Sequence, residues 1–343
     1  MRISKKCISL LLVSALCFSL VHICAISALA DSFFDSGDFT LAIKSDDTLA
    51  IAKYKGEDQN VKLPTHVEGR KVTGVYSHCF ENTNIKTIEI PDLYSTIGAF
   101  AFNGCEDLKS VDLPLSLQSI GIMAFSGSTS LKSVTSSRVT ELKVLPYAAF
   151  SGCTSLETVE IPESVNTLGD NVFTNCSSLT EVKLPAGITK IPEYTFYGCS
   201  ALEYLDIPDS VTELGESAFE NTSIKEIFIP EAVESIGENC FTPAANNGNT
   251  LFVCYKGTFA ESYFENNSVA NCRAIDKTQG DFNLDGKLNI SDATAIQKYK
   301  AQLGTNPLRQ ALETADVTGD GEVSVRDATL IQMRLAEIIS SFD

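Results

Sequence analysis

The sequence of 343 residues contains no tryptophan, only three histidines and only three methionines. Tryptophan offers the largest flat surface for stacking against a sugar ring, so its absence argues against a dedicated carbohydrate-binding site. The motifs GxSxG and HExxH and a phosphate-binding loop are also absent. The usual sequence signs of a serine hydrolase, a zinc peptidase and a nucleotide-binding enzyme are therefore missing.

Basic residues are scarce as well. The 26 Lys and Arg residues are outnumbered by 44 Asp and Glu residues, which gives a formal net charge of −18. Nucleic acids and anionic membranes bind clustered Lys and Arg, which an acidic chain of this kind does not provide. We therefore expect neither as a partner.

Long apolar runs are limited to one, residues 7–30. It follows Arg2, Lys5 and Lys6, and it ends in Ala28-Leu29-Ala30 with small residues at −3 and −1. This pattern is typical of a secretory signal peptide over residues 1–30 and predicts a secreted, extracellular protein with no membrane contact after cleavage. An uncleaved membrane anchor is the alternative, because the run is long. Cleavage would remove three basic and no acidic residues and change the net charge from −18 to −21.

A repeat occupies the middle of the chain. Phenylalanines recur at intervals of 22 to 25 residues, and prolines keep a similar spacing. The repeated phenylalanines are Phe80, Phe102, Phe125, Phe150, Phe173, Phe196, Phe219 and Phe241. A period in the low twenties with Leu, Val and Ile at fixed offsets predicts a leucine-rich-repeat solenoid.

One full unit, LETVEIPESVNTLGDNVFTNCSS, spans residues 156–178. Its apolar residues alternate with Thr158 and Glu160, which is the period of a short strand with one face in the core. Pro162 ends the strand because it has no N–H to donate, and Gly169 is expected to permit a tight turn. A single unit cannot bury its apolar face alone, so neighbouring units are expected to stack.

The pattern x-Ile-Pro-x-Ser-Val-x-x-Ile-Gly-x-x-Ala-Phe-x-x-Cys resembles the leucine-rich repeats of BspA-like bacterial surface proteins. About eight repeats over residues 65–242 show the resemblance. Residues 31–64 contain an alternating hairpin pattern and are predicted to form an N-terminal cap. Residues 243–276 are predicted to form a C-terminal cap and linker, with a strand, a short helix and a strand over residues 251–275. Caps cover the open ends of a solenoid, which would otherwise expose core and strand edges.

Eight cysteines lie beyond the predicted signal peptide. Four of them recur three residues after a repeat phenylalanine, namely Cys105, Cys153, Cys176 and Cys199. Equivalent positions of stacked repeats lie above one another, so we interpret these four as buried, reduced thiols that pack as small apolar side chains. Cys254 and Cys272 lie outside this pattern and are the one pair that a disulfide could join.

The outward strand residues predict an acidic solenoid face with aromatic residues at its C-terminal end. The candidate ligand-binding residues are Glu89, Asp112, Glu160, Tyr204, Asp206 and Phe228. Such a face would suit a basic protein or, at the aromatic end, a polysaccharide. The alternative is a solvated sheet face that only keeps the protein soluble.

Near the C-terminus, GDFNLDGKLNISD resembles the calcium loop of an EF-hand, and ADVTGDGEVSVRD repeats its layout 35 residues later. Each loop has oxygen-bearing side chains at positions 1, 3, 5, 9 and 12, a glycine at position 6 and a main-chain carbonyl at position 7, as a hard cation requires. The predicted ligands of two Ca²⁺ sites are Asp281, Asn283, Asp285, Lys287, Asn289, Asp292, Asp316, Thr318, Asp320, Glu322, Ser324 and Asp327. The helices predicted after the loops, over residues 292–303 and 327–338, share six of twelve residues.

Two loop–helix copies without entering helices resemble a type I dockerin, over residues 277–343. The resemblance implies a small all-α, calcium-binding module that plugs into a cohesin domain on a scaffoldin, as in cellulosomes. It also implies cohesin-contacting residues just before each closing Asp and along each helix. These are Ile290, Ser291, Gln297, Lys298, Val325, Arg326, Gln332 and Met333. Thr318 is a weaker oxygen ligand than the usual Asn or Asp, so the second site is expected to bind calcium less tightly.

The predicted protein is a mixed α/β chain with a capped leucine-rich-repeat solenoid followed by a dockerin. Dockerins often accompany glycoside hydrolases, but that reaction needs two carboxylates in one pocket, and a solenoid face offers columns. His78 is next to Cys79, yet adjacent side chains usually point apart. We therefore expect no enzyme, and favour a non-catalytic binding subunit of a polysaccharide-degrading complex. A regulator such as a peptidase inhibitor and an unrecognised glycoside hydrolase are the alternatives.

Overall fold

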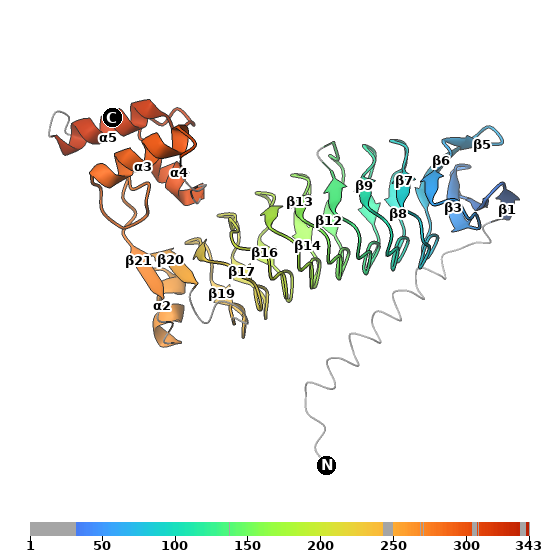
Figure 1. The fold of residues 1–343 in the computed structure, drawn as a ribbon, viewed down its shortest axis with the longest axis horizontal. Coiled ribbons are helices and arrows are strands. Elements are labelled where there is room, and N and C mark those ends of the chain that lie inside the picture. Colours follow the sequence, from blue (N-terminus) through green and yellow to red (C-terminus); the bar gives the residue numbers. More distant parts are fainter. Residues whose placement is uncertain are drawn as a thin grey trace, which may run out of the picture.

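The computed structural model describes residues 32–136, 138–242, 250–267, 269, 271–303, 307, 309–336 and 341–342. The predicted signal peptide, residues 1–30, lies outside the described residues. Figure 1 shows an elongated β-solenoid that ends in a group of helices at its C-terminal end. The solenoid has about nine turns, and the predicted class, a solenoid followed by a small helical region, is confirmed.

Two rows of short parallel strands run along the solenoid. The strands of the first row are β4 (Asn60–Lys62), β7 (Thr87–Glu89), β9 (Ser110–Asp112), β11 (Ser133–Thr135), β13 (Thr158–Glu160), β15 (Glu181–Lys183) and β18 (Glu226–Phe228). The strands of the second row are β8 (Thr96–Ile97), β10 (Ser119–Ile120), β12 (Val144–Leu145), β14 (Thr167–Leu168), β16 (Lys190–Ile191), β17 (Glu213–Leu214) and β19 (Ser235–Ile236). Each strand pairs in register with its equivalent in a neighbouring turn, as Thr158 does with Glu181.

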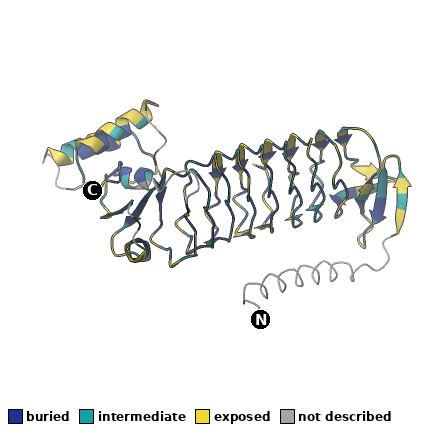
Figure 2. Cartoon of the chain, turned by 60° about the horizontal axis from the view of Figure 1, so that its bottom comes forward, coloured by how far each residue is buried: buried dark blue, intermediate teal, exposed yellow. Residues whose placement is uncertain are grey.

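The predicted alternation within one turn is confirmed in β13. Thr158 and Glu160 are exposed, whereas Val159 between them is buried. Val165 and Leu168 return to the core in the second half of the turn. Figure 2 shows this pattern along the whole solenoid, with the buried residues lining its interior.

The repeat phenylalanines form a continuous stack. Seven of the eight are buried, Phe241 is partly buried, and neighbouring ring centroids are 5.1 to 5.8 Å apart. Tyr54 of the N-terminal cap continues the stack below Phe80, with centroids 5.1 Å apart. Phe252 of the C-terminal cap meets the ring of Phe241 edge-on at 4.9 Å. The stack therefore links both caps to the repeats.

The repeat glycine is required for close approach and not for a turn. A Cβ on Gly169 would lie 2.5 Å from the main-chain nitrogen of Tyr147 in the preceding turn. Gly98, Gly121, Gly215 and Gly237 meet the preceding main chain in the same way. The φ angle of Gly169 is not positive, so the predicted role of this glycine in a tight turn is wrong. Glycine is needed here because any Cβ would clash with the main chain of the preceding turn.

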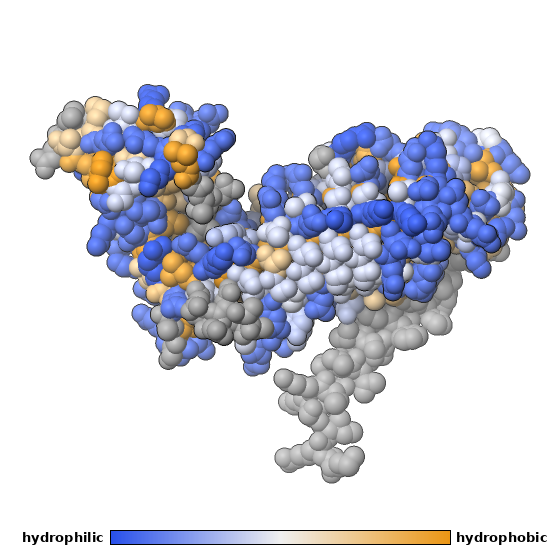
Figure 3. Space-filling view, in the orientation of Figure 1, coloured by the Kyte–Doolittle hydropathy of each residue, from blue (hydrophilic) through white to orange (hydrophobic). Residues whose placement is uncertain are grey.

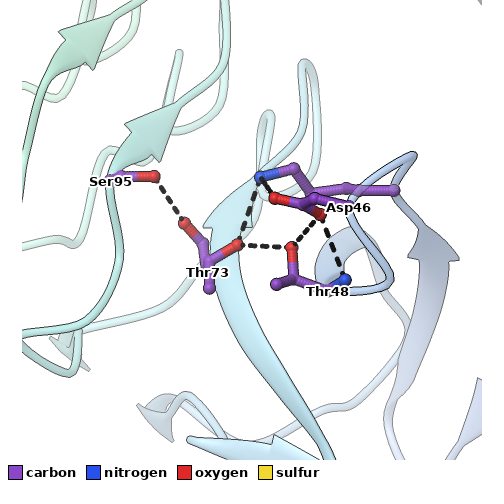
Figure 4. A network of polar contacts seen from close by, with 5 residues as sticks. Asp46, Thr48, Thr73 and Ser95 are labelled. Atoms are coloured by element: carbon purple, nitrogen blue, oxygen red, sulfur yellow. Dashed lines mark hydrogen bonds and ion pairs between the residues drawn. The ribbon is translucent and has the colours of Figure 1, made fainter.

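The N-terminal cap contains β1 (Phe33–Ser36), β2 (Phe39–Ile43), β3 (Leu49–Tyr54), β5 (His66–Val67) and β6 (Arg70–Val75). The predicted hairpin is confirmed, since β2 pairs antiparallel with β3. Within the cap, the hydroxyl groups of Thr48 and Thr73 lie 3.1 Å apart. The hydroxyl of Ser95 in the next turn donates to the carbonyl of Thr73 at 3.3 Å and so links the cap to the repeats (Figure 4).

The C-terminal cap has the predicted order of strand, helix and strand. These elements are β20 (Leu251–Tyr255), α2 (Phe259–Asn266) and β21 (Cys272–Ile275). The hydroxyl of Thr258 caps α2 by accepting from the N–H of Glu261 at 3.4 Å. β18, β20 and β21 form one parallel sheet, so the cap extends the first row of strands.

Within the part of the chain that the structure describes, three helices follow the cap: α3 (Ile290–Lys300), α4 (Arg309–Ala315) and α5 (Val325–Leu335). Ala293 and Ile296 of α3 pack with Ala328 and Ile331 of α5 in one buried apolar cluster. Because α3 and α5 come from the duplicated sequence, equivalent residues of the two copies meet in this core.

Candidate functional site

The first C-terminal loop, residues 281–292, closes around its own carboxylates. Asp281 accepts hydrogen bonds from the N–H groups at loop positions 5 and 6, at 3.0 and 2.7 Å. Asp292 accepts from the N–H groups at positions 3 and 9, at 3.2 and 2.8 Å. The main chain of the loop is therefore wound around the carboxylates of its first and last residues.

The second loop, residues 316–327, repeats this arrangement. Asp316 accepts from the N–H groups at positions 5 and 6, at 3.2 and 2.8 Å. Asp327 accepts from those at positions 3 and 9, at 3.1 and 2.7 Å. The duplicated sequence thus has a duplicated conformation.

The closing carboxylates also start the helices. Asn289 is the N-cap of α3 with Asp292 at its third position, and Ser324 is the N-cap of α5 with Asp327 there. Both are capping boxes, in which each residue satisfies a main-chain N–H of the other. The helices therefore begin at residues 290 and 325, two residues before the predicted starts.

Position 6 of each loop needs glycine. Gly286 has φ +81° and Gly321 has φ +85°. These angles lie in the left-handed region, which side chains with a Cβ adopt only at a cost. The sharp turn that the sequence predicted at this position is present in both copies.

The carboxylates at both ends of the first loop are buried, with Asp281 1% and Asp292 0% exposed. Burial raises the pKa of Asp281, and the neighbouring carboxylates of Asp292 and Asp285 add to the rise. Burial also raises the pKa of Asp292, with a further contribution from Asp285. Main-chain hydrogen bonds oppose both shifts. A cation among these oxygens would relieve the repulsion.

The second loop is more open. Burial tends to raise the pKa of Asp316, but hydrogen bonds, led by that from the N–H of Gly321, outweigh burial and lower the pKa below its usual value. The carboxylate of Asp316 is therefore stabilised as an anion without a metal, so a cation has less repulsion to relieve here.

The donor set of each loop fits a hard cation. No three Asp, Glu, His or Cys side chains of the described residues converge as a preformed metal cluster. The loops instead offer carboxylates together with amide or hydroxyl oxygens and the main-chain carbonyls of Lys287 and Glu322. An all-oxygen set of this kind suits Ca²⁺ better than softer metals.

The residues predicted to contact a cohesin lie at the surface of α3 and α5. Ile290 and Val325 occupy equivalent positions and are 58% and 56% exposed. Ser291, Gln297, Lys298 and Arg326 are also exposed, whereas Gln332 and Met333 are half-buried. Figure 3 shows hydrophobic residues on the outside of this helical module, among hydrophilic ones.

Helix α4 was not predicted. It directly precedes Asp316, so the expectation that neither loop has an entering helix is wrong for the second copy. The hydroxyl of Thr314, in the last turn of α4, donates to the carbonyl of Asp281 at 2.8 Å. The carbonyl of Thr314 accepts from the N–H of Gly280 at 2.6 Å. α4 therefore holds the start of the first loop.

The first loop packs on the C-terminal cap. One buried apolar cluster combines Phe228 of the last solenoid strand, β18, and Val253 and Ile275 of the cap with Phe282 and Leu284 of the loop. A Cβ on Gly286 would lie 3.6 Å from the Cβ of Ile275. The helical module and the solenoid thus share a core at this point.

Phe228 does not belong to an open solenoid face. It was predicted to point outward with Tyr204, but it is only 2% exposed and lies under the helical module. Tyr255 packs edge-on against its ring, with centroids 5.1 Å apart. That prediction is wrong because a strand face that is open in the repeats is covered at the cap.

The remaining predicted face residues are exposed. Glu89, Asp112, Glu160, Tyr204 and Asp206 all reach the surface. Lysines offset part of the acidic charge: Lys62 pairs with Glu89 at 2.6 Å, and Lys183 lies 3.5 Å from Glu160. The face is therefore a mixed ionic surface, less acidic than the sequence indicated.

The predicted interpretation of the repeated cysteines is confirmed. Cys105, Cys153, Cys176 and Cys199 are buried free thiols, and each Sγ donates to the carbonyl of a phenylalanine in the preceding turn at 3.1 Å. Ser128 makes the same contact to Phe102 at 2.9 Å. Cys254 and Cys272 are free thiols on adjacent strands, with Sγ atoms 4.0 Å apart.

Neither the His78–Cys79 pair nor the hollow beside the C-terminal cap joins a nucleophile to a base. The imidazole of His78 contacts Glu81 at 2.7 Å, whereas Cys79 is buried. A hollow of about 390 Å³ beside the C-terminal cap is lined by Phe241, Phe252, Tyr263 and neighbouring residues, none of which is Asp, Glu or His. Within the described ranges, no helix has the length and apolar character needed to cross a membrane.

Two family models match the chain. The model of the BspA type leucine rich repeat region matches six copies over residues 73–170 and 136–247. The model of the dockerin type I domain matches residues 279–336. The comparison with curated proteins found no match.

Solved structures with a similar fold are leucine-rich-repeat proteins. One from Bacteroides ovatus has a TM-score of 0.50 at 23% identity and covers 67% of this chain and 65% of its own. One from T. pallidum has a TM-score of 0.49 at 24% identity, covering 62% and 92%. One from Eubacterium ventriosum has a TM-score of 0.49 at 28% identity, covering 58% and 52%, so the chain spans about half of that relative.

Proposed function

Since the chain belongs to the BspA-type leucine-rich-repeat proteins and ends in a type I dockerin domain, we propose that it is a secreted, non-catalytic subunit of a scaffoldin-based complex. A dockerin implies docking to a cohesin, and leucine-rich repeats are protein-binding repeats. Neither matched domain is catalytic. The dockerin would attach the chain to the complex, and the solenoid would present a binding surface.

The observation that carries this proposal is the duplicated loop. Both copies wind their main chain around the carboxylates at positions 1 and 12 with equivalent hydrogen bonds. Type I dockerins typically bind calcium, and we assign one Ca²⁺ to each loop. Bound calcium would neutralise the carboxylates and hold the loop closed.

The ligand assignments follow the loop positions. In the first loop they are Asp281, Asn283, Asp285, the carbonyl of Lys287, Asn289 and Asp292, and in the second Asp316, Thr318, Asp320, the carbonyl of Glu322, Ser324 and Asp327. The side chains of Lys287 and Glu322 are exposed and would not ligate. The hydroxyl of Thr318 is a weaker oxygen ligand than the amide of Asn283 at the same loop position, which supports tighter binding in the first site than in the second.

The cohesin would bind the outer surface of α3 and α5. Ile290 and Val325 supply exposed apolar side chains at equivalent places, and polar residues surround them. An apolar centre with a polar rim is the usual composition of a protein interface. Ser291, Gln297 and Lys298 would flank it in the first copy, and Arg326, Gln332 and Met333 in the second.

A direct binding measurement tests the docking function. The chain beginning at residue 31 is passed over immobilised type I cohesin modules in calcium and then in EDTA. We expect capture in calcium, release in EDTA, and at least about a tenfold weaker affinity when Ile290 and Val325 are both changed to Asp. Failure of every type I cohesin to capture the calcium-loaded chain would overturn the proposal.

We assign the ligand surface of the solenoid to the exposed face with Glu89, Asp112, Glu160, Tyr204 and Asp206. Its mixed charge favours a protein ligand over a polysaccharide. A pull-down from proteins of the surrounding medium, comparing the intact chain with a variant in which Glu160 is changed to Lys, identifies the partner class. Loss of a partner in the variant supports this face, and retention of every partner excludes it.

The secreted location and the cleaved signal peptide over residues 1–30 remain part of this proposal. Scaffoldins are extracellular, so a dockerin favours export, and the polysaccharide-degrading setting follows from the same resemblance. N-terminal sequencing of the exported protein checks the cleavage. We expect the mature chain to begin at Asp31.

A further inference from the structure

The two calcium loops have similar sequences and hydrogen bonds but different surroundings. At position 4, Leu284 of the first loop is 2% exposed, whereas Gly319 of the second is exposed. At position 6, Gly286 lies against Ile275 of the cap, whereas a Cβ on Gly321 would meet nothing within 4 Å. At these two positions, only the first loop lies against the cap.

Position 4 of the first loop has an apolar side chain that a free-standing loop would expose. The equivalent glycine of the second copy shows that the loop conformation does not need a side chain at this position. Leu284 also has a φ of +50°, an unfavourable angle for a leucine. The main-chain strain at Leu284 is offset by burial of its side chain in the cluster that includes Ile275 and Phe228.

Polar contacts hold the chain at the joint. Lys277, between the cap and the first loop, pairs with Glu231 of the last turn at 3.3 Å. Its ammonium group also lies 5.4 Å from the centre of the Tyr255 ring. These two contacts of Lys277 tie the connection between cap and first loop to the end of the solenoid.

We propose that calcium in the first loop fastens the dockerin to the C-terminal cap, so that the solenoid and the docking module form one rigid body. This inference rests on the proposed calcium binding. Leu284 and Phe282 reach the cap only while the loop is wound, and the ligands at positions 1, 3, 5 and 12 wind it. Calcium in the second loop acts mainly within the module, because positions 4 and 6 of that loop, the equivalents of Leu284 and Gly286, face open space.

Thermodynamic linkage makes the effect reciprocal. If calcium in the first loop favours the contact with the cap, then the contact must strengthen calcium binding by the same factor. Weakening the contact should therefore lower the affinity of one calcium site and leave the other unchanged. We expect a loss of about tenfold, the size of a typical coupling between sites.

Hydrogen exchange of the full-length mature chain tests the inference. Exchange is followed in a peptide covering β20, with and without calcium. Calcium should slow exchange there by about tenfold, since the docked module restricts opening of the cap sheet. The matched variants are Leu284→Ala, under the cap, and Leu303→Ala, which removes a side chain that is 77% exposed. Leu284→Ala should abolish the calcium effect, and Leu303→Ala should keep it.

A second variant, in the cap, controls for the possibility that Leu284→Ala unfolds the loop itself. Ile275→Ala should also abolish the calcium effect on exchange. Calorimetry should still record two bound calcium ions, and the affinity of the first loop should be about tenfold lower than in the unaltered chain. Calcium-dependent protection of β20 that persists in both Leu284→Ala and Ile275→Ala would overturn the inference and leave the proposed function standing. Absence of calcium uptake by the unaltered chain would instead refute the proposed function.

Discussion

The ring of Phe150 stacks on the ring of Phe173, with centroids 5.8 Å apart and planes 7° apart. Both side chains are almost completely buried. Each belongs to a different turn, so the pair joins two units that are 23 residues apart in the sequence. The stability of the solenoid therefore depends on contacts between turns more than on contacts within them.

Removing one ring from the middle of the stack should destabilise the solenoid strongly. Phe150→Ala leaves a cavity between Phe125 and Phe173, and we expect a loss of about 3–5 kcal/mol in the free energy of unfolding. Urea unfolding followed by far-UV circular dichroism measures it. The control is Leu115→Ala, at a side chain 41% exposed, with an expected loss below about 0.5 kcal/mol. Equal losses in the two variants would contradict the stacked arrangement.

Chelation of calcium should unfold the helical module and leave the repeats folded. The module has fewer than about seventy residues and a thin core, so it needs the metal as a staple. Adding EDTA should remove the helical part of the far-UV spectrum, while the thermal transition of the solenoid remains. A spectrum that does not change on chelation would show that the module folds without calcium.

The buried thiols should be inert at ordinary pH. Burial raises the pKa of Cys176 to about 12 and that of Cys254 to about 12. A raised pKa means that the thiolate, the reactive form, is almost absent at pH 8 and becomes abundant only as the pH approaches 12. In the native protein at pH 8 we expect a disulfide reagent to modify no cysteine other than the half-buried Cys272. All eight should react in guanidinium chloride, and rapid native reaction of several thiols would refute their burial.

One of the two possible cohesin orientations should dominate. The two copies differ in charge at equivalent positions, with Lys298 in place of Met333 and Ser291 in place of Arg326. Ile290→Asp and Val325→Asp should therefore weaken cohesin binding unequally, by a factor of about ten between them. Calorimetry with Leu303→Asp as the control measures both. Similar losses would indicate that the two orientations are equally populated.

Local patterns were enough to predict the solenoid. Phenylalanine spacing identifies the turns because every turn repeats the same contact, and the alternation around Val159 identifies the inner face of a strand. The wound loops were equally predictable, because the spacing of Asp281, Gly286 and Asp292 is dictated by the geometry of one short segment. Each of these predictions uses residues that are close in the sequence or equivalent by repetition.

The errors concern contacts between distant segments. Phe228 has the alternation of an exposed strand residue, and only the folded chain shows that the loop around Leu284 covers it. Helix α4 is only seven residues long, too short to show a clear helical period, so its sequence was not told from a linker. Leu284 itself was passed over because the loop pattern assigns no role to position 4. Its apolar side chain beside charged ligands was the one available sign of a covered loop.

The contact at Gly169 bears on how such a chain can change in length. Neighbouring turns meet through the ring stack and, in most turns, through the glycine approach and a thiol or hydroxyl contact. Pro146 and Pro192 stand at the glycine position of two turns. A duplication or deletion of one whole 23-residue unit would therefore create no new kind of joint. Each added unit would move the N-terminal end about 4.8 Å farther from the docking module. The number of units therefore sets how far the solenoid surface extends from the docking module.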